Sequence, residues 1–173
     1  MLTISREADY AVRLVVHLAT SDKERFQSET LAQEEHVPKS FLVKILQLLI
    51  RRQLVRSFRG ARGGYQLAVN PEQLTLYRVL EMVEGPMGLN LCVLRGAGCD
   101  LRTRCAVHEV WTEAQGQLRQ ILQSATIADL ARRTLQKRLR FVQGGSGEST
   151  VPKSVSPQSR VPADGPSARK GSD

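Results

Sequence analysis

The three cysteines of this chain, Cys92, Cys99 and Cys105, lie in one short segment that restricts the fold more than any other feature of the sequence. The residues between them include glycines and charged side chains and lack the apolar period of a helix or a strand, so we expect a loop. His108 follows Cys105 after two further residues. Three thiols and an imidazole at this spacing predict a loop around a soft metal ion or an iron–sulfur cluster, because thiolates are the ligands that such centres select.

The composition indicates an anionic partner. In the 173 residues, lysine and arginine outnumber aspartate and glutamate by 25 to 17, which gives a formal net charge of +8 and favours nucleic acid. No apolar run approaches the roughly 20 residues that span a bilayer, and the N-terminus lacks the pattern of a signal peptide, so we expect no membrane contact. Clustered cysteines without an export signal indicate a reducing compartment, which we expect to be the cytoplasm.

The first half of the chain predicts three helices followed by a β-hairpin. A first helix begins after the capping residue Ser5, Ser28 caps a second, and Pro38 lies in the first turn of a third. Two β-favouring runs, 54–58 and 65–69, flank a glycine-rich turn. This order is typical of a winged helix-turn-helix, so we expect a mainly α fold with a small β-hairpin wing. The side chains that the third helix should bury are Phe41, Leu42, Ile45, Leu46 and Leu49.

The second half predicts a fourth helix, a long dimerisation helix and a last helix. Thr75 caps the fourth helix and Gly85 ends it, after which the cysteine loop begins. The dimerisation helix carries an apolar seam with heptad spacing, which consists of Val107, Trp111, Ala114, Leu118, Ile121 and Ala125. Thr126 and Asp129 form a predicted capping box for the last helix. The side chains that this helix should turn inward are Ile127, Leu130, Leu135 and Leu139.

These elements divide the chain into four regions. Residues 1–85 form the predicted winged helix-turn-helix DNA-binding domain, 86–106 the cluster-binding cysteine loop, and 107–141 the dimerisation helix and the C-terminal helix. Residues 142–173 are rich in glycine, serine and proline and contain almost no large apolar side chains. Such a segment buries too little surface to offset its ordering entropy, so we expect a disordered tail.

The expected DNA-contacting surface comprises the third helix and the wing. No acidic residue occurs between Glu35 and Glu72, a stretch that carries seven lysines and arginines. A solvated basic face is the plainer interpretation, but phosphate contact explains the missing acids better. Lys39 belongs to this surface; Ser40, Lys44 and Gln47 are expected to reach base edges, and Arg51, Arg52 and Arg56 to contact phosphates. Arg59 and Arg62 flank a turn where Gly63 and Gly64 favour positive φ and a guanidinium can enter a narrow minor groove.

Several motifs resemble one known family. They are Thr3-Ile-Ser-Arg-Glu-Ala-Asp-Tyr-Ala-Val12, Val37-Pro-Lys-Ser-Phe-Leu-Val-Lys-Ile-Leu46, Leu54-Val, Arg59-Gly-Ala-Arg-Gly-Gly-Tyr-Gln-Leu67, Val83-Glu-Gly85 and the cysteine loop. Over residues 1 to about 135, they resemble the Rrf-two family of IscR/NsrR-type bacterial regulators. This resemblance implies a homodimeric, cluster-sensing transcription regulator. Such a regulator binds a palindromic operator in double-stranded DNA and responds to iron–sulfur status, oxidative stress or nitric oxide.

The resemblance also implies a ligand set. The three cysteines match the family's cluster ligands, and two residues are candidates for the fourth. His108 stands where IscR-like members with a [2Fe–2S] centre have a ligand, and Asp9 where NsrR-like members supply a carboxylate from the partner chain to a [4Fe–4S] centre. Either could instead be an ordinary polar residue near a helix N-terminus. We favour His108, because a ligand in the same loop leaves less chain to order. His17 and His36 we interpret as ordinary surface or core-edge residues.

Three other interpretations stay open. Zinc would suit thiol ligands, although structural zinc sites usually space their paired ligands two to four residues apart, closer than here. Unliganded thiols would make the loop a redox sensor, because exposed cysteines oxidise readily. An iron–sulfur electron carrier or assembly partner, whose basic face docks an acidic protein, is a different class. The sequence offers no nucleophile–base pair, nucleotide loop or paired carboxylates, so we expect no enzyme.

Overall fold

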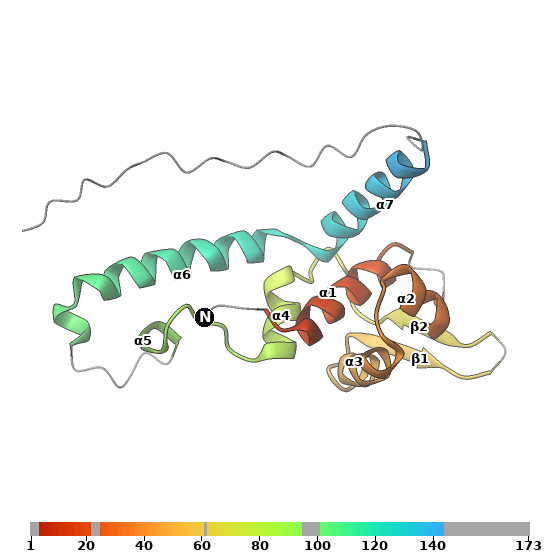
Figure 1. Ribbon diagram of the computed structural model, residues 1–173, viewed down its shortest axis with the longest axis horizontal. Helices are drawn as coiled ribbons and strands as arrows, with labels where there is room; N and C mark the ends of the chain where they lie inside the picture. Colours follow the sequence, from red (N-terminus) through yellow and green to blue (C-terminus); the bar gives the residue numbers. More distant parts are fainter. Residues whose placement is uncertain (1–3, 22–24, 61, 95–100, 144–173) are drawn as a thin grey trace, which may run out of the picture.

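The computed structural model describes residues 4–21, 25–60, 62–94 and 101–143. Within these ranges the chain is mostly helical and carries one antiparallel hairpin, which confirms the predicted fold class (Figure 1). Expectations for Cys99 and for the tail beyond residue 143 lie outside the described residues. The elements are α1 (Arg6–Leu18), α2 (Ser28–Glu34), α3 (Lys39–Arg51), β1 (Val55–Phe58), β2 (Gly64–Leu67), α4 (Leu76–Glu84), α5 (Leu91–Leu94), the 3-10 helix η1 (Arg102–Arg104), α6 (Ala106–Ser124) and α7 (Ile127–Gln143).

Helices α1, α2 and α3 pack around an aliphatic core. Ser5 caps α1 as predicted, since its Oγ accepts a hydrogen bond from the Ala8 backbone N–H at 3.1 Å. Each of the next two helices begins one residue away from its predicted start. Gln27, not Ser28, occupies the N-cap of α2, because its backbone is extended. Pro38 is the N-cap of α3 rather than part of its first turn. The fully buried leucines and isoleucine of this core are Leu14, Leu18, Leu31, Ile45, Leu46, Leu49 and Leu54.

The hairpin forms the wing. β1 pairs with β2 in antiparallel register, with Val55 opposite Leu67 and Phe58 opposite Gly64. An isolated bridge between Phe26 and Tyr65 ties the segment before α2 to β2. The hairpin therefore rests on the helical body at β2 and projects its turn outward (Figure 1).

Two glycines shape the turn for different reasons. Gly64 has a φ of +135°, as predicted, and this conformation is one that residues with a Cβ rarely adopt. Gly63 does not have positive φ, so the prediction for it is wrong. Glycine is required there because a Cβ would lie 2.4 Å from the carbonyl oxygen of Phe58 and 2.8 Å from that of Gly60.

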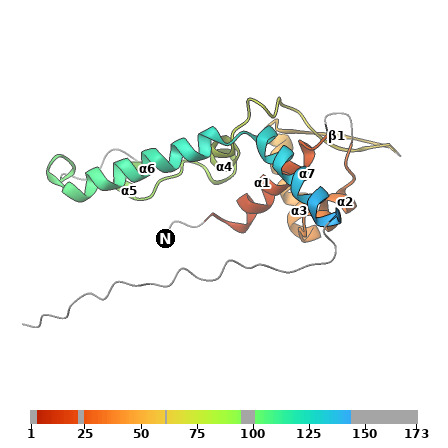
Figure 2. The same ribbon diagram turned by 90° about the horizontal axis from the view of Figure 1, so that it is seen from above.

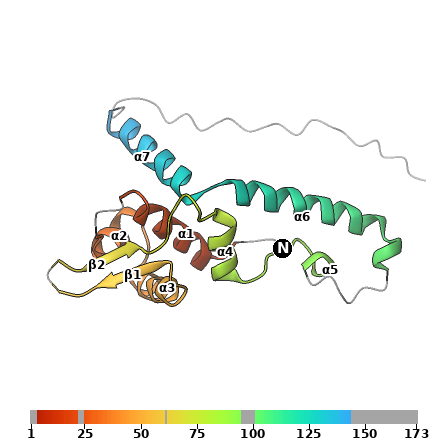
Figure 3. The ribbon, with the colours of Figure 1, turned by 180° about the vertical axis from the view of Figure 1, so that it is seen from behind.

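Helix α6 extends from the winged-helix body as an arm, with α5 beneath its far end (Figures 1 and 2). The chain runs along α6 from the far end of the arm back to the body, where α7 lies against α1 on the side opposite α3 (Figure 3). The predicted capping box is confirmed: Thr126 Oγ1 accepts the Asp129 N–H at 3.1 Å and donates to Asp129 Oδ2 at 3.0 Å. Ile127 is fully buried and fixes the start of α7 to the body.

Three apolar side chains predicted to face the core are exposed instead. Phe41 on α3 is 40% exposed because it lies at the rim of the core, where its ring packs edge-to-face with that of Tyr10. Leu135 and Leu139 are exposed because the residues of α7 that reach the core lie at its beginning, among them Ala128 and Ala131. Among the described helices, none combines the length and the apolar character needed to cross a bilayer.

Candidate nucleic-acid interface and cysteine loop

Helix α3 has one buried face and one exposed polar face. The buried face holds the core leucines and Ile45, so the remaining side chains must point to solvent. Every residue of α3 predicted to contact DNA lies on that exposed face: Lys39, Ser40, Lys44, Gln47 and Arg51. Arg52, directly after the helix, is exposed as well. The predicted exposure of these side chains is confirmed, and their contact with DNA remains a prediction.

The wing contributes a second group of exposed basic residues. Arg56 on β1 and Arg59 and Arg62 in the turn are all exposed. Among the described residues, no salt bridge engages a basic side chain of α3 or the wing. Their charges are thus available to an external anion such as the phosphate backbone.

Arg25 and Gln27 support the wing, and no motif in the sequence pointed to either residue. The Arg25 guanidinium carbon lies 3.9 Å from the centre of the Phe58 ring, and its Nη1 donates to the Arg62 carbonyl at 3.3 Å. Gln27 Nε2 donates to the Gly63 carbonyl at 2.7 Å. These contacts join residues 36 and 37 positions apart, and no local pattern predicts such pairs. Arg25 also adds a further positive charge beside the turn.

The two described cysteines flank the loop at its helical ends. Cys92 lies in α5, and Cys105 is the N-cap of α6; both are half-buried free thiols. The described residues form no group of three or more metal-ligating side chains, and Cys99 lies outside them.

His108 lies in the first turn of α6, three positions after Cys105. Its backbone N–H donates to the Cys105 carbonyl at 3.0 Å, so the two residues are held together. Arg102 Nε donates to the ring Nε2 at 3.1 Å, and Thr112 Oγ1 lies 3.5 Å from the same nitrogen. The other ring nitrogen, Nδ1, is buried and has no hydrogen-bonding partner in the described part of the chain. A buried imidazole nitrogen without a partner is unusual, and it makes His108 a candidate for binding a group that the protomer does not itself supply.

Asp9, the other candidate for the fourth ligand, lies in a different environment. Its side chain is 58% exposed on α1, and its Oδ2 is 3.4 Å from Arg13 Nη1 one turn later. An exposed carboxylate paired within its own helix satisfies the ordinary role of an acid in a first helical turn.

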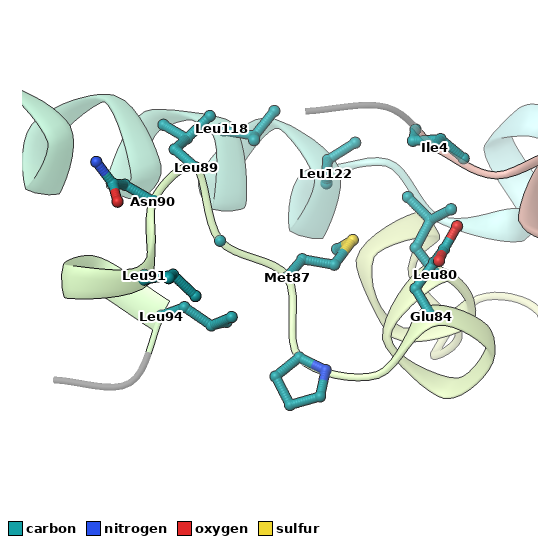
Figure 4. Close-up of a pocket in the computed structure, with 12 residues that line it drawn as sticks. Ile4, Leu80, Glu84, Met87, Leu89, Asn90, Leu91, Leu94, Leu118 and Leu122 are labelled. Atoms are coloured by element: carbon teal, nitrogen blue, oxygen red, sulfur yellow. The ribbon is translucent and has the colours of Figure 1, made fainter. Parts of the chain in front are cut away.

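The residues of the predicted seam of α6 differ in their exposure to solvent. Val107, Trp111 and Ile121 are exposed, whereas Ala114 and Leu118 are half-buried. Leu118 and its neighbour Leu122 line a cavity of about 480 Å³ between α6, the end of α4 and α5 (Figure 4). Ala125 lies just beyond the end of α6, as its C-cap.

Loop residues of the same chain cover the inner side of α6. Gln115 Oε1 accepts the Leu89 backbone N–H at 2.9 Å, and its Nε2 donates to the Met87 carbonyl at 3.3 Å. The exposed apolar residues of the helix, including Val110, therefore lie on the side that the protomer does not cover.

A three-helix body, a hairpin wing and an exposed basic third helix define a winged-helix DNA-binding protein. The chain belongs to the Rrf2 family, whose model is described as an iron-dependent transcriptional regulator and matches residues 4–133. It is thus a DNA-binding transcriptional regulator of this family, which confirms the expected fold and this part of the expected function.

The chain aligns with related proteins over most of their length. The regulator NsrR of Shouchella clausii is 28% identical over 131 residues, which cover 75% of this chain and 90% of NsrR. The Mycobacterium tuberculosis protein Rv1287 is 34% identical over 131 residues, 75% of this chain and 81% of its own. The structure of CymR, the global cysteine regulator of Bacillus subtilis, superposes with a TM-score of 0.64 at 28% identity, covering 77% of this chain and 98% of CymR. IscR of T. potens shares the fold, with a TM-score of 0.60 at 22% identity over 84% and 94% of the two chains.

Proposed function

We propose that this regulator is a homodimer that binds a palindromic operator and holds an iron–sulfur cluster on Cys92, Cys99, Cys105 and His108. Its DNA affinity then depends on the state of this centre, which links transcription to iron–sulfur status, oxidative stress or nitric oxide. Such a role places the protein with the DNA, in the cytoplasm. The observation that carries the cluster proposal is the buried, unpartnered Nδ1 of His108, whose backbone N–H bonds to the carbonyl of the free cysteine Cys105.

DNA recognition follows from the exposed face of α3. Ser40, Lys44 and Gln47 project from the middle of this face and reach base edges in the major groove. The arginines at the end of α3 and in the wing contact phosphates and the adjacent minor groove. In a symmetric dimer, two copies of α3 lie about one DNA turn apart, so the operator repeats its half-site with inverted orientation.

The donor set of the loop fits an iron–sulfur cluster. Two half-buried thiols and a buried imidazole nitrogen are the soft and borderline donors that such a centre selects, and the thiols form no disulfide. A cluster bound there supplies a redox-active group that is sensitive to oxidants, iron supply and nitric oxide. Convergence of Cys92 and Cys105 on one centre ties α5 to the N-terminus of α6. The position of α6, and with it the spacing of the two reading helices, then depends on the ligands.

The fourth ligand is better assigned to His108 than to Asp9. The Nδ1 atom of His108 lacks a partner in the described part of the chain, and the ring is held at Nε2 by the N–H of Arg102. Because Nε2 accepts that hydrogen bond, the neutral ring carries its proton on Nδ1, so ligation through Nδ1 requires the proton to move to Nε2 and the Arg102 contact to break. Asp9 already has Arg13 as a partner and would serve only through a second chain. A histidine in this position favours a [2Fe–2S] over a [4Fe–4S] centre by analogy with the IscR-like members.

The test is the visible absorption spectrum of the protein purified without oxygen, with iron and sulfide assayed on the same sample. Charge-transfer bands with matching iron and sulfide support the proposal, and C105A should abolish them. H108A should change the bands or lower the cluster content severalfold, because second-shell and ligand losses commonly cost about 10–100-fold in metal affinity, whereas D9N should leave the spectrum unchanged. A colourless, iron-free wild-type sample would overturn the cluster.

A thiol-redox regulator is the second candidate. It is favoured by one observation, that Cys105 is a free, half-buried thiol at the N-terminus of the long helix α6. Oxidation of this cysteine would then change DNA affinity without any metal. Loss of DNA affinity on peroxide treatment of an iron-free sample, reversed by a thiol reductant, would support this candidate instead.

A further inference from the structure

The entrance to the helix-turn-helix turn is held by a residue from the far end of the described chain. Arg138 on α7 donates from Nη1 to Glu34 Oε2 at 2.9 Å and from Nη2 to Glu35 Oε1 at 2.7 Å. Glu34 is the last residue of α2 and Glu35 is its C-cap. One guanidinium therefore binds two successive carboxylates at the point where the chain leaves α2 and turns toward α3.

A buried histidine completes this cluster from the side of α1. His17 is 1% exposed, and its Nδ1 lies 2.7 Å from Glu35 Oε1 and 3.3 Å from Arg138 Nη2. Its ring packs edge-on against Phe26, with centroids 4.8 Å apart. Arg13, also on α1, lies 3.7 Å from the other oxygen of Glu35. We call Arg138, Glu34, Glu35, His17 and Arg13 the turn cluster.

The link from the turn cluster to α3 is short and stiff. Only His36, Val37 and Pro38 separate Glu35 from the first residue of α3. His36 has a φ of +50°, which is uncommon for a residue with a side chain, Val37 is buried, and the ring of Pro38 fixes its own φ. A displacement of Glu35 is thus passed to the start of α3 rather than absorbed in the turn.

The other end of the turn cluster leads to α6. Arg138 lies on α7, which is joined to α6 by Ala125 and Thr126. Backbone hydrogen bonds from Leu76 to the Ala125 carbonyl and from Ile127 to the Leu74 carbonyl hold this junction, both at 2.8 Å. The match to the family model ends at residue 133, so the contact made by Arg138 lies beyond it.

We propose that Arg138 is a positioning residue that fixes the direction of α3 relative to α6 and thereby sets the half-site spacing that the dimer accepts. This inference rests on the proposed dimeric operator binding. Arg138 does not touch DNA, since α7 lies on the opposite side of the body from α3 (Figures 1 and 3). The planar guanidinium suits this task because it donates to two acceptors in fixed directions, whereas a lysine offers a single point charge.

The experiment compares the full-length wild type with R138A, R138K and a matched control, R140A. Arg140 is an exposed arginine on the same helix, and no salt bridge to it occurs among the described residues. Operators are first selected from random duplex DNA with the wild type. Affinities are then measured for one isolated half-site and for palindromes whose half-sites are moved apart in single base-pair steps around the selected spacing.

We expect the wild type and R140A to lose at least about fivefold in affinity for each misplaced step, which is the usual lower range of coupling between two sites. R138A should accept neighbouring spacings within about twofold while its half-site affinity stays within about twofold of the wild type. R138K should lie between them. E34A should also weaken the preference for the selected spacing. The double variant R138A/E34A should have the same spacing preference as R138A, because both substitutions remove one and the same contact.

Three failures are distinguishable. If the wild type binds no palindrome better than a half-site, dimeric operator binding itself is wrong, and this inference falls with it. If the wild type has a spacing preference that R138A and R138K both retain, only the positioning role of Arg138 is overturned. A loss of half-site affinity in R138A equal to its loss on palindromes indicates a general structural role and also overturns the proposal. If R138A does not fold, R138K decides by the same criteria.

Discussion

The side chains of His17 and Glu35 form a buried contact, with 2.7 Å between Nδ1 and Oε1, that joins the last turn of α1 to the end of α2. An ionised carboxylate only accepts hydrogen bonds, so the imidazole Nδ1 must donate the proton in this contact. Glu35 is 13% exposed and has two cationic neighbours, Arg13 and Arg138. Burial by itself raises the pKa of Glu35. The hydrogen bond and electrostatic attraction from His17, with the charges of Arg138 and Arg13, outweigh burial and hold the pKa below the ordinary 4.5.

This depressed pKa predicts a loss of stability in acid. The contribution of Glu35 is fully present above pH 4.5, the ordinary pKa of the unfolded carboxyl, and is lost as the pH falls through the lower folded-state pKa. E35Q should lower the free energy of unfolding at pH 7 by about 1.5–3 kcal/mol, the range for hydrogen bonds to charged groups. The difference from the wild type should shrink below pH 4.5, as followed by urea denaturation with far-UV circular dichroism.

The control for E35Q is E81Q. Glu81 forms an exposed pair with Arg78 at 2.7 Å, a kind of surface salt bridge that contributes about 0–1 kcal/mol. E81Q should therefore leave the denaturation midpoint nearly unchanged at both pH values. A wild type and E35Q that differ equally at pH 7 and in acid would contradict the assigned role of the Glu35 charge.

Charge reversal in the wing should weaken DNA binding. R59E replaces an exposed cation of the turn by an anion, and we expect affinity to fall uniformly across sequences. The slope of log K against log salt should become shallower by about 1 for the lost phosphate contact. R140E changes the net charge by the same amount on the opposite side of the body and should leave affinity within about twofold, since exposed charges beyond a Debye length are screened. Titrations of a labelled duplex at several salt concentrations measure both, and equal losses in the two variants would leave only a non-specific charge effect.

Two glycine substitutions should have opposite effects. G63A places a Cβ 2.4 Å from the Phe58 carbonyl oxygen, so the turn must shift and the arginines beside it lose their positions. Its affinity for DNA should fall while the far-UV spectrum stays helical.

A Cβ at Gly116 in α6 meets nothing within 4 Å, so G116A should stabilise the protein by about 0.5–1 kcal/mol through helix propensity. Thermal denaturation and duplex binding test the pair, and a G63A protein with unchanged DNA affinity would show that the turn tolerates the clash.

The features that the sequence predicted correctly are those determined by nearby residues. Ser5, Thr75 and Thr126 accept backbone N–H groups three residues ahead, and such caps depend on residues within one helical turn. The exposed face of α3 follows from apolar periodicity in the same way. The N-cap of α2 is an exception to this local rule. Gln27 occupies it in place of Ser28, and its side chain donates to the carbonyl of Gly63, 36 positions along the chain.

The features that the sequence missed depend on distant contacts. His17 was expected at the surface or core edge, yet it is fully buried, because Glu35 supplies the polar partner that burial requires. Arg138 lies 103 positions from Glu35, and no spacing rule connects them. Phe41 has a helical position that faces inward by period alone, but the core ends at its ring. For the cysteine loop, spacing predicts donors but not their convergence, and the ligand set remains a prediction.

The proposed dimer predicts that an exposed apolar residue of α6 is essential for association. Ile121 is 65% exposed in the protomer, so I121E should not disturb the core of the fold. If α6 pairs with its copy, each dimer loses two buried isoleucines. At about 1.5–3 kcal/mol for each side chain, we expect the dimer dissociation constant to rise by at least about a hundredfold. Sedimentation velocity over a range of protein concentrations measures this shift.

Leu139 provides the matched control for this test. It is 61% exposed, nearly as much as Ile121, but lies on α7 outside the predicted seam. L139E introduces the same charge into an equally exposed apolar site, so it should leave the dissociation constant unchanged while I121E raises it. Dissociation in both variants would indicate that added charge alone separates the chains, and dissociation in L139E only would move the interface from α6 to α7. Because dimeric recognition places two copies of α3 on one duplex, I121E should also lose the preference for a palindrome over an isolated half-site.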